Sequence, residues 1–136
     1  MMRMQTKFRS ESGASAVEFA LLLPVLMMVL FGIIEFGFAL YQQAILTNAS
    51  REGARLGIVQ SIPAITTAQI DAQIDNYLSQ TGINPANVSR TIVAGGPTGT
   101  PVRVTLTLPY TFLVLPNLTS LSPTLNLKAY TEMRHE

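Results

Sequence analysis

The residues able to do acid–base or metal chemistry are few and lie far apart along the chain. Histidine occurs once, at His135, the residue before the last, where chain ends usually fray. Asp71 and Asp75 share a helix face, but no histidine or further acid lies at metal-ligand spacing around them. We therefore expect a solvated helix face here, with no metal site and no cofactor. The pattern argues against an enzyme.

The length and composition of the chain limit which classes of protein it can belong to. A chain of 136 residues has room for one membrane anchor and one small domain. It contains no cysteine, which excludes disulfides and thiolate metal sites. The formal net charge of +1 gives no argument for nucleic-acid binding. An assembly or binding protein fits these limits better than a catalyst.

Glu18 is the most informative charged residue, because it stands at the edge of a long apolar run. Phe19 to Tyr41 is 23 residues, or about 34 Å of helix, enough to cross a hydrocarbon core about 30 Å thick. The run exceeds the roughly 7 to 15 apolar residues of a secretory signal peptide, and no small-residue cleavage site follows it. We predict a transmembrane helix. From position alone, Glu18 either snorkels to the headgroups or pairs with a cation.

Two further residues of the predicted transmembrane helix are unusual for a membrane span. Glu35 lies about 24 Å beyond Phe19 along a helix axis, near the far membrane interface. It either snorkels outward or pairs with a basic group on a partner. Pro24 lacks an amide proton and is expected to kink or loosen the helix, a change that membrane helices tolerate.

The basic residues predict the orientation. Three precede the span and two follow it at ten or more positions, namely Arg3, Lys7, Arg9, Arg51 and Arg55. The positive-inside rule then favours a cytoplasmic N-terminus. We therefore expect a cytoplasmic N-terminal segment, a transmembrane helix that ends at Tyr41 and an exported domain over 42–136.

The first helix is expected to continue outside the membrane through Gln60, because no proline or turn cluster intervenes. Ala49, Gly53 and Gly57 recur every four residues and form a stripe of small side chains on one face. The stripe either packs against the chain's own sheet or receives a helix of a neighbouring subunit.

Three charged residues share this part of the helix. Glu52 is three residues before Arg55, and Arg51 is four residues before Arg55. One carboxylate therefore faces two guanidinium groups. As an exposed helix pair, such an arrangement is worth only a few tenths of a kcal/mol.

A second helix and a sheet follow. Thr66-x-x-Gln69 predicts a capping box, and Gly82 predicts the end of the helix. The apolar positions between them have helical spacing: Ile70, Ile74, Tyr77 and Leu78. Strands are expected over Val88–Ala94, Pro101–Leu108 and Leu125–Met133, with a separate apolar run over Tyr110–Leu115 and loops over 95–99 and 116–123. The fold class is α+β: a long N-terminal helix, transmembrane and continuing outside, and a second helix packed on an antiparallel sheet of about three to four strands.

The start of the apolar run resembles the processing site of type IVb prepilins of the Flp kind. It reads G-A-S-A-V-E-F from Gly13 to Phe19, after a short basic tail. In that family a prepilin peptidase cuts after the glycine, and a glutamate is fifth in the mature chain. The resemblance implies cleavage after Gly13, a new N-terminus at Ala14 and Glu18 as the fifth residue. It thereby divides the chain into a cytoplasmic leader over residues 1–13, a transmembrane helix over 14–41 and an exported domain over 42–136.

Other segments resemble the TadE-like pseudopilins of tight-adherence (Flp) pilus systems. They are A-V-E-F-A-L-L-L-P-V-L at 16–26, G-I-I-E-F-G at 32–37 and N-A-S-R-E-G-A-R at 48–55. The terminal A-Y-T-E-M-R-H-E is also similar to the close of such chains. The related TadF-like and TadG-like proteins share the anchor and part of this pattern.

The resemblance implies a minor pseudopilin of the bacterial inner membrane that takes part in Flp pilus assembly, with its C-terminal domain in the periplasm. The implied partners are a prepilin peptidase, other pseudopilins and pilins, the inner-membrane assembly platform and the lipid bilayer, but not nucleic acid. The residues expected to act in pairing and assembly are Glu18, Glu35, Arg51, Glu52, Gly53 and Arg55.

Two alternatives remain open. The first is an uncleaved, membrane-anchored periplasmic scaffold that never joins a filament. The second is a membrane-tethered ligand-binding module. Aromatic residues make up 7% of the chain and tryptophan is absent, which argues against the concave aromatic site that such a module needs.

Overall fold

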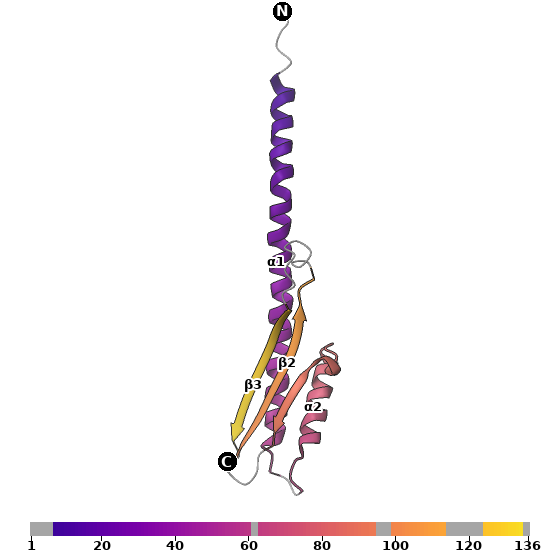
Figure 1. Cartoon of the computed structure of the whole chain (residues 1–136), viewed down its shortest axis with the longest axis vertical. Helices are drawn as coiled ribbons and strands as arrows, with labels where there is room; N and C mark the ends of the chain where they lie inside the picture. Colours follow the sequence, from indigo (N-terminus) through magenta and orange to yellow (C-terminus); the bar gives the residue numbers. More distant parts are fainter. Residues whose placement is uncertain (1–6, 61–62, 95–98, 114–123, 135–136) are drawn as a thin grey trace, which may run out of the picture.

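The computed structural model describes residues 7–60, 63–94, 99–113 and 124–134. In chain order these form α1 (Lys7–Gly57), α2 (Thr67–Gln80), the short 3-10 helix η1 (Pro85–Asn87), β1 (Ser89–Val93), β2 (Pro101–Thr111) and β3 (Thr124–Arg134) (Figure 1). A long apolar helix, a second helix and a three-stranded antiparallel sheet confirm the predicted α+β class.

Several sequence-based expectations concern residues outside these ranges. They are the first six residues of the leader, most of the loop over 95–99, the loop over 116–123 and the frayed end at His135.

α1 is one continuous helix of 51 residues, about 77 Å long, and it passes through Pro24 without interruption. It ends at Gly57, earlier than the predicted Gln60. Glycine and the β-branched residues that follow it, Ile58 and Val59, are weak helix formers. The Val59 N–H closes the end with a tighter turn, donating to the Leu56 carbonyl at 3.1 Å.

Both predicted ends of α2 are confirmed. The Thr66 hydroxyl accepts from the Gln69 N–H at 3.3 Å, and the Gln69 side chain accepts from the Thr66 N–H at 2.9 Å. At the other end, Gly82 has φ +81°, and the Ile83 N–H donates to the Leu78 carbonyl at 3.1 Å. This is a Schellman ending, which favours glycine because an L side chain is strained at positive φ.

The sheet has the order β1-β2-β3, and both pairings are antiparallel. β2 runs past the predicted end at Leu108 to Thr111 and so includes the first two residues of the apolar run expected over Tyr110–Leu115. Residues 114–115 of that run lie outside the described ranges. β1 pairs only with residues 103–107, so Pro109 lies past the end of β1 and pairs only with Asn126 of β3. A proline is tolerated there because the missing amide leaves no partner on β1 unpaired.

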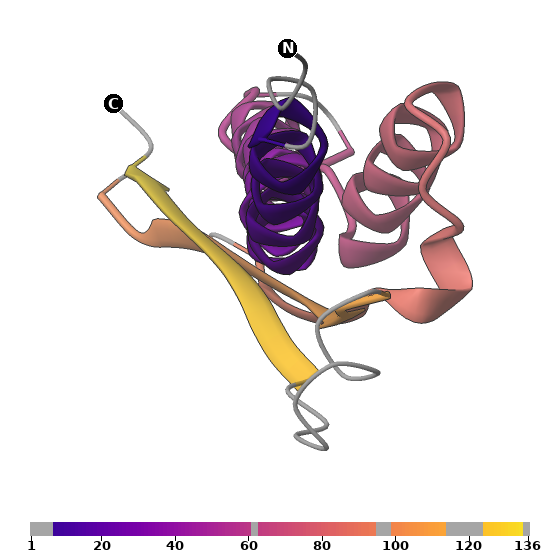
Figure 2. The ribbon, with the colours of Figure 1, turned by 90° about the horizontal axis from the view of Figure 1, so that it is seen from above.

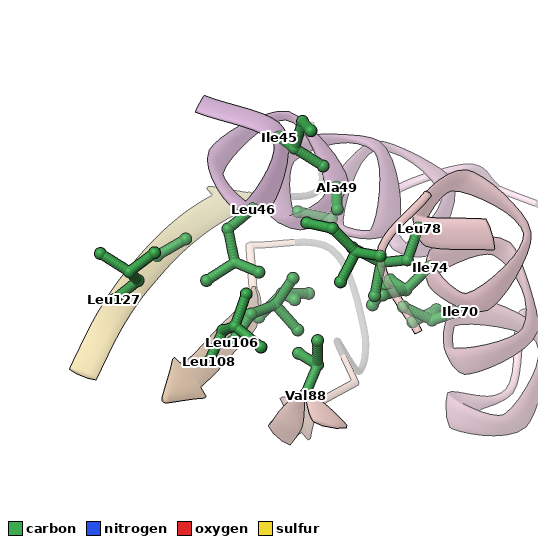
Figure 3. Packing of buried hydrophobic residues seen from close by; sticks show 14 of the residues in the cluster. Ile45, Leu46, Ala49, Ile70, Ile74, Leu78, Val88, Leu106, Leu108 and Leu127 are labelled. Carbon is green, nitrogen blue, oxygen red and sulfur yellow. The ribbon is translucent and has the colours of Figure 1, made fainter. Parts of the chain in front are cut away.

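The hydrophobic core lies between the two helices and one face of the sheet. α1 and α2 lie side by side on this face (Figure 2). The alternating β2 side chains point into the core as predicted, and they meet apolar residues of both helices (Figure 3). Fully buried members are Leu46, Ala49, Ala54, Ile70, Ile74, Leu78, Val102, Val104 and Leu106. The core therefore holds only the C-terminal part of α1.

Candidate functional site

Among the residues whose burial is described, the N-terminal part of α1 is exposed throughout residues 13–31. Large apolar side chains are exposed along it from Val17 to Ile34. Among the described residues, α1 is the one helix long and apolar enough to cross a membrane. Exposure of this much apolar surface fits a helix surrounded by lipid.

The residues of the expected processing site lie together on α1. Gly13, Ala14, Glu18 and Phe19 are all helical and exposed. A Cβ atom built on Gly13 meets nothing within 4 Å, and the φ angle of Gly13 is not positive. The fold of this chain therefore does not require glycine at position 13.

Glu35 is buried, with 5% of its surface exposed. Its carboxylate accepts a hydrogen bond from the Leu113 N–H, and its carbonyl accepts one from the Tyr110 hydroxyl at 3.2 Å. The expectation that Glu35 snorkels outward is therefore wrong, because the end of β2 folds back on α1 and covers the carboxylate. A role of Glu35 in pairing with a partner stays a prediction.

Aromatic residues hold the end of β2 on α1. The ring of Phe112, which is buried, lies 5.8 Å from that of Phe36 and 5.2 Å, edge to face, from that of Tyr110. Ala39, one turn after Glu35, is also buried. The sheet thus contacts α1 within the stretch predicted to span the membrane.

The stripe of small residues packs inside the fold. A Cβ atom on Gly53 would lie 2.8 Å from the Ile74 side chain of α2. On Gly57 it would lie 2.7 Å from Val102 of β2 and 2.9 Å from Ile70 of α2. The stripe therefore packs within its own chain, as one of the two alternatives predicted. It contacts α2 as well as the sheet. Gly53 packs against α2 of its own chain, and its assignment as an assembly residue stays a prediction.

The predicted ion pair between Glu52 and Arg55 is present, with N–O distances of 2.6 and 3.0 Å. The Gln73 amide of α2 also donates to Glu52, at 3.5 Å. The hydrogen bond from Arg55 is the main cause that holds the pKa of Glu52 below its ordinary value. Arg51 is exposed, and it is not among the causes of this pKa shift.

Sequence reasoning missed a polar cluster centred on Arg90 of β1. Its Nη1 atom donates to Asp71 at 2.9 Å and to Asp75 at 2.5 Å, and its Nη2 atom donates to the Pro85 carbonyl at 2.8 Å. Burial disfavours the charged guanidinium, but the hydrogen bonds and charges of the two acids outweigh it and raise the pKa of Arg90. The expected solvated face is thus corrected to a clamp that joins α2 to β1.

A second polar contact, also missed, joins α1 to β3. Ser50 is fully buried, and its hydroxyl lies 2.7 Å from the Thr131 hydroxyl and donates to the Thr47 carbonyl at 2.8 Å. The Gln43 amide donates to the Lys128 carbonyl at 3.0 Å. These bonds fix the helix on the edge strand of the sheet.

The described part of the chain contains no group of three or more His, Cys, Asp or Glu residues able to hold a metal ion. The polar clusters found here link secondary-structure elements to one another. The class that this architecture defines is an α+β protein whose single long apolar helix fits membrane anchoring.

The family model described as TadE-like protein matches residues 13–55. Over these residues the chain is similar to TadE-like proteins, and the match supports a link to the Tad pilus system. The matched region contains the apolar helix and the charged residues up to Arg55. No curated protein and no solved structure matches the chain.

Proposed function

We propose that this chain is a minor pseudopilin that takes part in assembly of Flp-type pili. It is inserted in the bacterial inner membrane with its N-terminus in the cytoplasm and its α+β domain, 42–136, in the periplasm. A prepilin peptidase cuts it after Gly13. The observation that carries the proposal is the family match, which begins at Gly13 and includes Glu18.

The surroundings of Gly13 are compatible with a role in processing, although Gly32 and Gly37 of the same helix are equally open. Glycine in a helix interior is destabilising by roughly 0.5–1 kcal/mol relative to alanine. No contact within the chain offsets that cost, because a side chain at this position would meet open space. A peptidase that binds the backbone closely supplies the missing reason, since any side chain would hold the two backbones apart. The weak helix at Gly13 also makes local unwinding for cleavage less costly.

Cleavage would create a new charge beside Glu18. A free α-amino group at Ala14, with a reference pKa of about 7.7–8.0, is mostly protonated at neutral pH. Residues 14 and 18 are about 6 Å apart along the helix axis. Two opposite charges at the bilayer edge cost less together than singly. Glu18 is exposed on α1, and the resemblance to pilins favours pairing with the N-terminus of a neighbouring subunit.

The proposed partners follow from the similarity to TadE-like proteins of the Tad system. They are the prepilin peptidase, the other pseudopilins and pilins, and the inner-membrane assembly platform. α1 contributes both the apolar anchor and a wall of the core. Movement of the anchor by an assembly platform would therefore move the α+β domain with it.

The mass of the protein extracted from membranes tests the proposal. In cells with active prepilin peptidase we expect a chain that begins at Ala14. Gly13→Leu should leave the full-length precursor in the membrane. Gly37→Leu is the matched control, because a side chain there also meets nothing within 4 Å, and it should be cut normally. An intact wild-type chain beginning at Met1 would instead favour the uncleaved scaffold.

A further inference from the structure

We propose that the end of β2, taken together with the two residues that follow it (Tyr110–Leu113), is inserted into the membrane leaflet nearest the sheet and makes a second membrane contact beside α1. The inference rests on α1 spanning the bilayer. It does not depend on a role in pilus assembly.

The first argument is depth. Apolar exposure on α1 does not stop at Glu35, since four large side chains beyond it are more than half exposed: Phe36, Phe38, Leu40 and Tyr41. Lipid that covers this surface reaches Tyr41, and tyrosine is typical of the interface. Glu35 lies six residues earlier, about 9 Å deeper along the axis. The end of β2 docks at Glu35, so it lies at the same depth, inside the leaflet.

The second argument is the pairing of backbone groups. Non-helical backbone is tolerated in a bilayer to the extent that its polar groups are bonded within the protein. On its β3 side, β2 stays paired up to Thr111, opposite Thr124, whereas β1 pairs with β2 only up to Thr107. Beyond the pairing, the Leu113 N–H donates to the Glu35 carboxylate. The same bond gives Glu35 the partner that a carboxylate at this depth requires.

The third argument is the surface that the end of β2 presents. Leu113 is 82% exposed, and Leu125, directly opposite Tyr110 on β3, is 43% exposed. Between α1 and the end of β2 lies a groove of about 330 Å³. Its lining is Phe31, Ile34, Glu35, Phe38, Gln42, Tyr110, Thr111 and Leu113.

The occupant that this groove fits is the acyl chain of a phospholipid. Phe31, Ile34 and Phe38 belong to the same exposed apolar surface as the rest of the anchor. The groove is therefore continuous with the part of α1 that lipid already surrounds. Figure 1 shows the end of β2 lying alongside α1, farther toward the N-terminus than α2 reaches.

The chain contains no cysteine, so single-cysteine variants can carry a fluorescent label at chosen depths. Leu113→Cys tests the end of β2, and Leu125→Cys tests it from β3. Val93→Cys is the matched control, an apolar position 50% exposed and opposite Arg103, at the other end of the sheet. Leu26→Cys reports the depth of the anchor itself. Each full-length protein is placed singly in nanodiscs of phosphatidylethanolamine and phosphatidylglycerol.

Two quenchers then separate lipid from water: a nitroxide on the lipid acyl chain, and iodide in solution. We expect the nitroxide to quench the labels at 113 and 125 severalfold more than the label at 93. We expect iodide to quench the label at 93 severalfold more than the labels at 113 and 125. Iodide quenching at 113 equal to that at 93 would overturn the proposal. Protection at 113 from both quenchers would also overturn it, because protein would then cover the site. Quenching of the label at 26 by iodide and not by the nitroxide would also overturn the proposal, because α1 would then not span the bilayer.

Discussion

The carboxylate of Glu35 accepts a hydrogen bond from the backbone N–H of Leu113, 78 residues later in the chain. The bond joins the end of β2 to a part of α1 that hydropathy assigns to the membrane span. Contacts of the folded sheet with α1 thus begin at Glu35 and Phe36, earlier than Gln42. Anchor and sheet share about two turns of helix.

Replacement of Glu35 tests this bond directly. In Glu35→Leu the Leu113 N–H loses its charged acceptor, a change worth about 1.5–3 kcal/mol. Hydrogen exchange of the Leu113 amide, followed by NMR in detergent, should become roughly tenfold to a hundredfold faster. Glu35→Gln is the control, because its amide oxygen still accepts, and its exchange should rise less. Equal exchange in Glu35→Leu and the wild type would mean that the bond contributes nothing to docking.

A truncated chain starting at Gln42 should fold but lose the docking of β2. It keeps the α1 residues that line the core, from Ile45 to Ala54, and therefore the contacts with α2 and the sheet. It lacks Glu35 and Phe36, the partners of Leu113 and Phe112.

Circular dichroism of the truncated chain should show a cooperative thermal transition. Amides at 110–113 should exchange fast while those at 102–108 stay protected. Protection of both segments would contradict a docking role for Glu35 and Phe36.

Gly53 should not tolerate a side chain. In Gly53→Val the new Cβ would meet Ile74 at 2.8 Å, and overpacking of this kind costs about 1–3 kcal/mol. Urea unfolding followed by circular dichroism measures the loss. Gly37→Val, with nothing within 4 Å of its Cβ, should be close to neutral. Equal stability of the two variants would show that α2 does not pack on Gly53.

The pKa of Glu52 should depend on Arg55 and not on Arg51. In the folded chain this pKa is below the ordinary 4.5, chiefly through the hydrogen bond from Arg55. A lowered folded pKa means that the ion pair adds stability above the ordinary pKa and loses it as pH falls through the folded value. Arg55→Gln should move the pKa back toward 4.5, measured by carbon-13 NMR titration of the carboxylate. A shift of similar size in Arg51→Gln would instead support the arrangement of one carboxylate between two guanidinium groups.

Glu18→Gln should separate processing from assembly. We expect this variant to be cut after Gly13 but to lose co-purification with the other pseudopilins, because the ammonium group of a neighbour is left unpaired. Glu18→Asp should be partly active, since it keeps the charge and shortens the reach by one methylene. Co-purification and surface pili are measured in the same strain. Normal assembly by Glu18→Gln would reduce Glu18 to a snorkelling residue.

Features that depend on near neighbours could be predicted from the sequence. The capping box of Thr66 and Gln69 involves residues three apart, and the buried face of β2 follows from the two-residue period of a strand. Pro109 was misleading because its tolerance depends on how far β1 extends beside β2. That distance is set by the fold and not by the residues around Pro109.

The long-range contacts left a weaker signal. Asp71 and Asp75 predicted a shared acidic face, but Arg90 comes from β1, 19 and 15 residues away. Two acids on one helix face and an arginine on a predicted strand have complementary charge. This was the only feature of the sequence that indicated the contact of Arg90 with Asp71 and Asp75. Leu113 left none, because it bonds Glu35 through a backbone N–H, a group that every residue except proline carries.

The unbroken course of α1 from Lys7 to Gly57 fixes the direction in which each of its side chains points around the axis. Successive residues turn by about 100°, so Glu18 and Glu35 point about 100° apart around the axis. The flank that the sheet occupies is therefore not the flank on which Glu18 lies. One residue inserted between Phe19 and Ile34 would swing the sheet by about 100° relative to Glu18 and raise it by about 1.5 Å. A neighbour bound to Glu18 would then meet a different side of the sheet, although every contact within the chain beyond Glu35 stayed the same.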